Sequence, residues 1–263
     1  MPRLERPDLA LHYEVTGHGP PLLMIAGFMS DHASWTPLVP LLAPHFTCIT
    51  PDNRTTGQTT PWDAPVSIDL MCKDALALMD ALGHDRYHVL GHSMGGIIAL
   101  HMAQEVPNRL ASTHVAASAP IRLPRNTALF ANLIAIRRSD APADTWLRAL
   151  FPWLFNPLVY HDPAAVDQAV AEALAYPHTQ TADAMEHQLT ALRGFDGTAL
   201  ASPTCPTQVL LGALDLIVPP DHILAVLSHL PHHIIETAGH SIHWDAPEAV
   251  ATHVRDYAAK HPI

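Results

Sequence analysis

The stretch Tyr87-His88-Val89-Leu90-Gly91-His92-Ser93-Met94-Gly95 places the pattern Gly-x-Ser-x-Gly directly after a short run of β-forming residues. The following residues, 97–104, are mostly apolar and favour a helix. A serine held in a sharp turn between strand and helix adopts a strained backbone, and its flanking positions need residues without bulk. The alternative for so short a pattern is a glycine-rich turn with an unreactive serine. The rest of the chain must therefore supply the partners of a nucleophile.

Two residues later in the chain have the identity and position that such a nucleophile requires. A serine hydroxyl needs a base, and the base needs an acid that orients it. Asp215 and His240 each follow a predicted strand, at the edge where open parallel sheets carry their sites. The order serine, aspartate, histidine is that of one known triad. We expect Ser93, Asp215 and His240 to be catalytic, with His243 as an alternative base and Glu236 as a poorer acid.

Short apolar runs alternate with helical patterns along most of the chain. Alternation of this kind predicts a mostly parallel sheet, of about eight strands, with helices on both faces. The fold class is therefore α/β. The strand candidates are 9–15, 22–26, 46–50, 87–90, 112–116, 208–211 and 233–236, and the clearest helices are 67–82, 97–104 and 250–260.

The alternation stops between residues 120 and 203. Aromatic and aliphatic residues there have helical spacing and form no convincing strand, and a structureless loop of that length would be unusual. We predict a core of residues 1–119 and 204–263 and a helical cap of residues 120–203. The apolar residues that we expect to contact a substrate in this cap are Phe151, Trp153, Leu154 and Phe155.

Composition excludes several classes of function. The 263 residues include 14 basic and 25 acidic side chains, giving a formal charge of −11, which disfavours nucleic-acid binding and electrostatic docking to membranes. The three cysteines form neither a disulfide framework nor a zinc motif. No signal peptide or spanning segment precedes the first strand, so we expect a soluble cytoplasmic protein. Its expected partner is a small molecule, and a homo-oligomer remains open.

Four motifs together resemble the α/β-hydrolase superfamily over essentially the whole chain. They are Ala26-Gly27-Phe28, Asp52-Asn53-Arg54 with Gly57, the turn around Ser93, and the Asp215 and His240 turns. The resemblance implies an oxyanion hole made by the backbone N–H groups of Phe28 and Met94. It also implies a helical cap over the substrate. Two segments depart from the family pattern: Ala26-Gly27 replaces the usual His-Gly, and Arg54-Thr55-Thr56-Gly57 replaces the usual Arg-Gly-x-Gly.

The identity of residue 93 narrows the resemblance. Dehalogenases and epoxide hydrolases of this superfamily carry aspartate there, so serine favours acyl transfer to water. We expect hydrolysis of an ester, lactone or thioester of a medium-sized, largely apolar molecule. No cofactor is expected, because no phosphate-binding glycine loop is present. No metal is expected either, because His232-His233 has no partner at metal-ligand spacing. The stretch Gly27–Trp35 and the cap sequence Pro152-Trp153-Leu154-Phe155 resemble, more weakly, the group that includes 3-oxoadipate enol-lactonases. The anionic substrate of those enzymes would require a cation in the pocket. The candidates are Arg122, Arg125, Arg137, Arg138, Arg148 and Arg193.

Two alternatives remain open from the sequence. A carbon–carbon bond hydrolase would use the same triad and would turn over simple esters poorly. A ligand-binding receptor of the same fold would keep the triad but would hydrolyse its ligand slowly or not at all.

Overall fold

Eight strands form one mixed sheet in the order β1-β2-β4-β3-β5-β6-β7-β8 in a computed structural model that describes residues 2–263. β2 runs antiparallel to β1 and β4, and the remaining neighbours are parallel. The α/β class and the mostly parallel sheet are confirmed. The strands are β1 (Arg3–Glu5), β2 (Ala10–Gly17), β3 (Pro21–Ile25), β4 (Thr47–Pro51), β5 (Tyr87–His92), β6 (Leu110–Ala116), β7 (Thr207–Gly212) and β8 (His232–Ile235).

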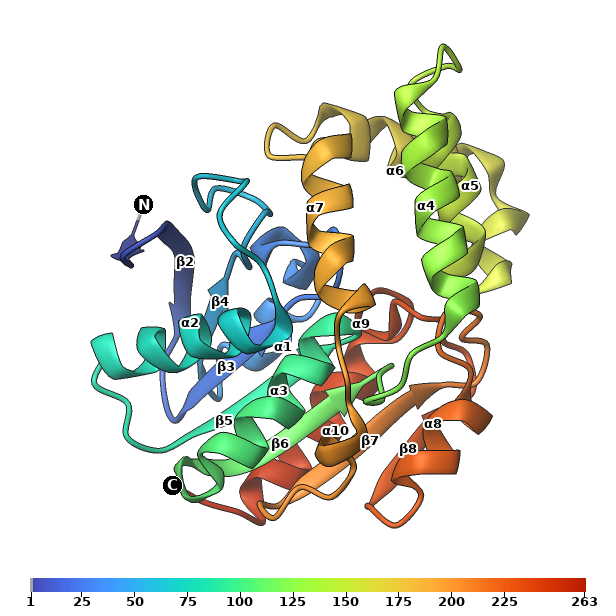
Figure 1. The fold of residues 1–263 in the computed structure, drawn as a ribbon. Coiled ribbons are helices and arrows are strands. Elements are labelled where there is room, and N and C mark those ends of the chain that lie inside the picture. The colour runs from blue at the N-terminus through green and yellow to red at the C-terminus, as the bar shows by residue number, and fades with distance from the viewer. Residues whose placement is uncertain (1) are drawn as a thin grey trace.

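The sheet is covered on both faces, as the continuous apolar strands predicted (Figure 1). In β3, Leu23 and Ile25 join one hydrophobic cluster while Leu22 and Met24 join the other, which is the period of two that a strand imposes. One face packs against α2 (Ile68–Ala81), α3 (Met94–Glu105) and α8 (Pro220–Leu227). The opposite face packs against α1 (Val39–Leu42) and α10 (Pro247–Ala259).

Helix ends follow local sequence rules. Ser67 caps α2, because its Oγ accepts a hydrogen bond from the N–H of Leu70 at 3.0 Å. The helix therefore begins one residue later than the pattern suggested. α3 begins at Met94, three residues earlier than the apolar run, because the strand turns directly into the helix at Ser93. The short strand β1 was not predicted, since three residues are too few to show a period.

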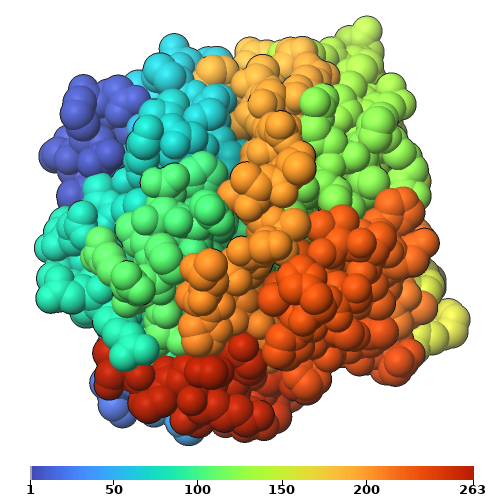
Figure 2. All heavy atoms as spheres, turned by 60° about the horizontal axis from the view of Figure 1, so that its bottom comes forward, coloured from blue at the N-terminus to red at the C-terminus, as the bar shows by residue number. Residues whose placement is uncertain are grey.

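Residues 120–203 hold helices and no strand. In Figure 1, α4 to α7 stand above the edge of the sheet at which the parallel strands end. The 3-10 helix η4, in the segment that follows α7, lies against α3. Figure 2 shows this segment in orange, running back along the surface between the residues of α3 and those of α8. The remaining helices are α4 (Pro124–Arg138), α5 (Thr145–Leu154), α6 (Pro163–Ala175), α7 (Ala182–Arg193), α9 (Ile242–Asp245), and the 3-10 helices η1 (His32–Trp35), η2 (Pro107–Arg109), η3 (Pro157–His161) and η4 (Thr198–Ala201).

Among residues 2–263, none of the helices combines the length and apolar character of a membrane-spanning segment. We refer to residues 120–203 as the cap and to the remainder as the core.

Candidate functional site

Ser93 occupies a strained turn between β5 and α3. Its φ of 54° lies in the left-handed region that non-glycine residues rarely adopt. Two hydrogen bonds support the turn, from the Ser93 N–H to the Ala116 carbonyl at 2.9 Å and from Ser118 Oγ to the Ser93 carbonyl at 2.6 Å. A Cβ at Gly95 would collide with the Ile25 carbonyl, so close packing of α3 on β3 requires glycine there.

Ser93, His240 and Asp215 form one chain of hydrogen bonds. His240 Nε2 lies 2.9 Å from Ser93 Oγ, and His240 Nδ1 lies 2.9 Å from Asp215 Oδ2. Because an ionised carboxylate can only accept, Nδ1 carries the proton and donates to Asp215. Nε2 is then free to accept the proton of the Ser93 hydroxyl. The fold thus brings together the three residues that the sequence singled out.

The surroundings of Asp215 fix its orientation. Its side chain is buried, and its Oδ1 accepts hydrogen bonds from the N–H groups of Ile217 and Val218, both at 2.8 Å. These donors hold Oδ1 in place and leave Oδ2 for His240. Glu236, the poorer acid candidate, is exposed and forms no hydrogen bond or ion pair with His240 among the described residues.

Two further histidines surround His240. His92 donates from Nε2 to the His240 carbonyl at 2.8 Å, so it supports the loop that carries His240. Burial and the neighbouring histidines lower the pKa of His92 well below its usual range. Burial also lowers the pKa of His243 to about 3. His243, the alternative base, lines the cavity but makes no hydrogen bond with Asp215 among the described residues. No sequence signal points to His92, because any residue can occupy that position of the pattern.

The N–H groups of Phe28 and Met94 have no hydrogen-bond acceptor among residues 2–263. They follow β3 and β5, which are neighbours in the sheet. The next residue, Met29, has a φ of 63° and donates its N–H to Gln188 Oε1 of α7 at 3.0 Å. Gln188 is fully buried and also donates to the Arg54 carbonyl at 3.2 Å. The cap thereby holds the loop that carries Phe28. No periodicity in the sequence could have revealed this role of a glutamine.

A cavity of about 590 Å³ lies between the cap and the core above Ser93. Three of the four predicted contact residues, Phe151, Leu154 and Phe155, line it. Trp153 does not, so that prediction was wrong. Two positions further along a helix, a side chain is rotated by about 200° around the helix axis, so residue 153 lies on nearly the opposite face from residue 151. Trp153 instead lies under the guanidinium of Arg125, at 5.9 Å from the ring centre.

Of the six candidate arginines, Arg137 is the one that lines the cavity. It stacks over Trp146 at 4.5 Å, and its Nη1 donates to the Gln180 carbonyl and contacts Met185 Sδ at 2.9 Å. The other five arginines do not line the cavity. Arg125 donates from Nη2 to the Leu216 carbonyl of the core at 2.6 Å, and Arg138 pairs with Asp183 and Glu186.

His12, His32 and Asp52 are the one group of side chains among residues 2–263 that lie close enough together to share a metal ion. Asp52 already accepts from His12 Nδ1 at 2.8 Å, from His32 Nδ1 at 2.7 Å, and from the N–H groups of His32 and Gln58. These four donors occupy the positions at which the carboxylate would bind a cation. The group therefore acts as a support of the loop after β4.

Comparison with known proteins gives a consistent result. The family described as alpha/beta hydrolase fold matches residues 20–247. A protein of Azorhizobium caulinodans whose assigned name is carbamate hydrolase RutD is 29% identical over 225 residues, which cover 83% of this chain and 82% of that protein. A thermophilic esterase from Thermogutta terrifontis superposes with a TM-score of 0.85, at 23% identity over the whole of both chains. The enol-lactonase of Burkholderia xenovorans superposes with a TM-score of 0.82, at 21% identity over 98% of this chain and all of that chain.

Proposed function

Because the chain belongs to the α/β hydrolase fold family, we propose that it is a serine hydrolase that cleaves an ester, lactone or thioester of a medium-sized, largely apolar molecule. The observation that carries the proposal is the hydrogen-bond chain from Ser93 through His240 to Asp215 at the floor of the cavity. Nothing about folding alone requires a strained serine to be aligned with a base and a buried acid.

In the proposed first step, Ser93 Oγ attacks the carbonyl carbon of the substrate while its proton passes to His240 Nε2. The carbonyl oxygen becomes an oxyanion, and the N–H groups of Phe28 and Met94 are the donors available to bind it. One such donor can contribute about 3–4 kcal/mol to lowering the barrier. Asp215 stabilises the imidazolium and does not itself take the proton. The imidazolium then protonates the leaving group, which departs and leaves an acyl group on Ser93.

In the second step, His240 takes a proton from a water molecule, and the resulting hydroxide attacks the acyl carbon. Collapse of this second oxyanion releases the acid and returns the proton to Ser93. The neutral state of His92 and His243 supports this assignment of roles. Their lowered pKa values mean that neither places a positive charge beside His240, where it would repel the imidazolium that forms when Ser93 attacks.

The cavity supports a small-molecule substrate. Its volume lies within the range of about 300–1,000 Å³ that is usual for such sites, and aromatic rings line one side. A carbamate is a second candidate substrate class, because the relative from A. caulinodans carries that name and the same acyl-transfer steps would apply.

A fluorophosphonate probe tests the proposal, because it labels only an activated serine. We expect labelling at Ser93 in the wild-type protein and none in Ser93→Ala, with both proteins equally folded by circular dichroism. A panel of esters, lactones, thioesters and carbamates then ranks the substrate classes. Folded wild-type protein that remains unlabelled would contradict the proposal and favour a binding protein of the same fold. Labelling with poor turnover of the whole panel would favour carbon–carbon bond hydrolysis.

A further inference from the structure

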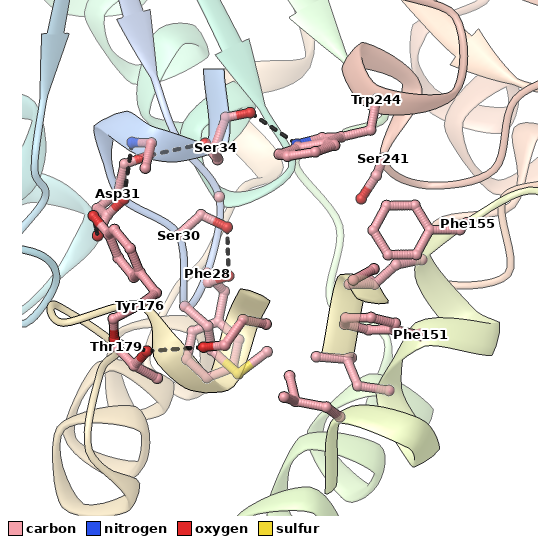
Figure 3. A pocket seen from close by; sticks show the side chains of 18 of the residues that line it. Phe28, Ser30, Asp31, Ser34, Phe151, Phe155, Tyr176, Thr179, Ser241 and Trp244 are labelled. Carbon is pink, nitrogen blue, oxygen red and sulfur yellow. Dashed lines mark hydrogen bonds between the residues drawn. The ribbon is translucent and has the colours of Figure 1, made fainter. Parts of the chain in front are cut away.

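The cavity above Ser93 has two chemically different walls, which face each other in Figure 3. Phe151 and Phe155 of the α5 region form one wall, with their rings edge to face at 5.2 Å. The opposite wall is polar. It consists of residues after β3 and residues after α6, namely Ser30, Asp31, Ser34, Tyr176 and Thr179.

The hydroxyl protons of the polar wall are already engaged. The Tyr176 hydroxyl donates to Asp31 Oδ2 at 2.9 Å, and Ser34 Oγ donates to the Asp31 carbonyl at 2.9 Å. Thr179 Oγ1 donates to the Tyr176 carbonyl at 2.8 Å, and Ser30 Oγ to the Phe28 carbonyl at 3.5 Å. What these groups still offer is lone pairs. The wall therefore presents hydrogen-bond acceptors, and it is suited to a ligand that donates hydrogen bonds.

Asp31 is the strongest of these acceptors. It is 7% exposed, and no Lys, Arg or His nitrogen lies within 4 Å of its carboxylate among residues 2–263. Oδ1 accepts from the N–H of Ala33 at 2.9 Å and Oδ2 accepts from Tyr176, so about half of the roughly four lone-pair positions remain. Burial, with a contribution from Asp52, raises the pKa of Asp31, and the neighbouring His32 opposes this by a smaller amount. A buried carboxylate that contacts no cation is costly, and a ligand cation in contact with it would reduce that cost.

Besides Asp31, the Asp, Glu, Lys and Arg side chains that line the cavity are Asp245, Glu172 and Arg137. Asp245 Oδ2 accepts hydrogen bonds from the N–H groups of Gly239 and Asn156, so this side chain helps to hold the loop that carries His240. Glu172 is exposed. The cation Arg137 contacts Gln180, Met185 and the ring of Trp146 rather than Asp31.

On the premise of the proposed serine hydrolase, we infer that the substrate carries a positively charged amine that binds the wall formed by Asp31 and Tyr176. The apolar remainder of the substrate lies on the wall of Phe151 and Phe155. Asp31 is three residues after Phe28, so their Cα atoms are at most about 11 Å apart. A single small molecule can therefore place its carbonyl at Ser93 and its amine at Asp31.

Isothermal titration calorimetry on the full chain tests this inference without requiring turnover. The two probes are hexylammonium and 1-methoxypentane, which have the same number of heavy atoms but differ in charge and in N–H donors. Since a hydrogen bond to a charged group stabilises by about 1.5–3 kcal/mol, we expect hexylammonium to bind at least about tenfold more tightly. Asp31→Asn should bring the two affinities within about threefold, because the amide keeps the shape and the acceptor for Ala33. The matched control Glu172→Gln, at the same cavity, should leave the wild-type ratio unchanged.

The outcomes separate this inference from the proposed function. Equal binding of the two probes to the wild-type protein would overturn the inference whether or not Asp31→Asn folds. A preference that persists in Asp31→Asn, or disappears in Glu172→Gln, would also overturn it, because another group would then recognise the amine. Probe labelling at Ser93 decides the hydrolase separately. An amine preference in a protein that the fluorophosphonate does not label would support the binding wall and contradict the enzyme.

Discussion

A chain of buried polar side chains on β5, β6 and β7 makes stability sensitive to acid. Gln208 Nε2 donates to the His253 carbonyl and lies 2.7 Å from His114 Nδ1, so it donates to that nitrogen as well. His114 then carries its proton on Nε2 and donates to Ser112 Oγ at 3.0 Å, and Ser112 in turn donates to His88 Nδ1 at 2.7 Å. All the hydrogen bonds of this side-chain network run in one direction, from Gln208 through His114 and Ser112 to His88. Each imidazole in the network is neutral.

Protonation of either histidine would place two donors against each other. Burial accordingly lowers the pKa of His88 to about 4 and that of His114 to about 3. In the unfolded chain both would titrate near 6.5. The stabilisation is therefore fully present above pH 6.5 and is lost as the pH falls toward 4, because the unfolded state binds protons that the folded state excludes. Between pH 7 and pH 5, each histidine should lower the free energy of unfolding by about 2 kcal/mol.

Urea unfolding at pH 7, 6 and 5 measures this loss. In His88→Gln or His114→Gln, the slope of the free energy of unfolding against pH should flatten by about 1 kcal/mol per pH unit. Ser112→Ala is the matched control. It breaks the same chain but removes no imidazole, so it should lower stability at every pH and keep the slope. Histidine variants with the wild-type slope would refute the reasoning, because the protons would then bind elsewhere.

Three further outcomes follow from the site. Asp215→Asn should lower kcat by about 10⁴-fold, because the amide stabilises the wrong tautomer of His240, and steady-state kinetics on a chromogenic ester would measure it. Equal activity would point to another carboxylate. Gln188→Met leaves the Met29 N–H without its acceptor, so kcat should fall while KM stays within about twofold, with a cost in stability of about 1–3 kcal/mol. A change in melting temperature alone would indicate a purely structural role. Gly95→Ala should lower the urea midpoint by the equivalent of about 1–3 kcal/mol through overpacking, whereas Gly194→Ala, which has room for a Cβ, should change it little.

The parts of the molecule that obey local rules can be predicted from the sequence. The strand before Gly27 is a continuous apolar run, and Ser93, Asp215 and His240 each follow a predicted strand. Because parallel strands end at one edge of a sheet, residues 93, 215 and 240 could be expected together before any coordinates were known. β1 was missed, and the ends of helices and strands shifted by one to three residues, because capping and hydrogen bonding decide them.

The contacts between cap and core could not be predicted in the same way. Gln188, Tyr176 and Asp31 are polar residues without a sequence pattern, and their partners lie far away in the chain. Gln188 is 159 positions from Met29, and Tyr176 is 145 positions from Asp31. The error at Trp153 has a related origin. The sequence identified an aromatic segment correctly, but which face of α5 meets the cavity depends on how the helix packs.

The same contacts imply that the cap contributes to the geometry around Ser93. Gln188 holds the residue next to Phe28, and the Leu154 carbonyl accepts the N–H of Ser241, next to His240, at 2.8 Å. The cap thus holds one loop on each side of Ser93. Donors and a base help only when they are held in place before the substrate arrives, because reorganising them would cost free energy during the reaction. A change in the cap that shifts α5 or α7 should therefore lower kcat even where no cavity residue is altered.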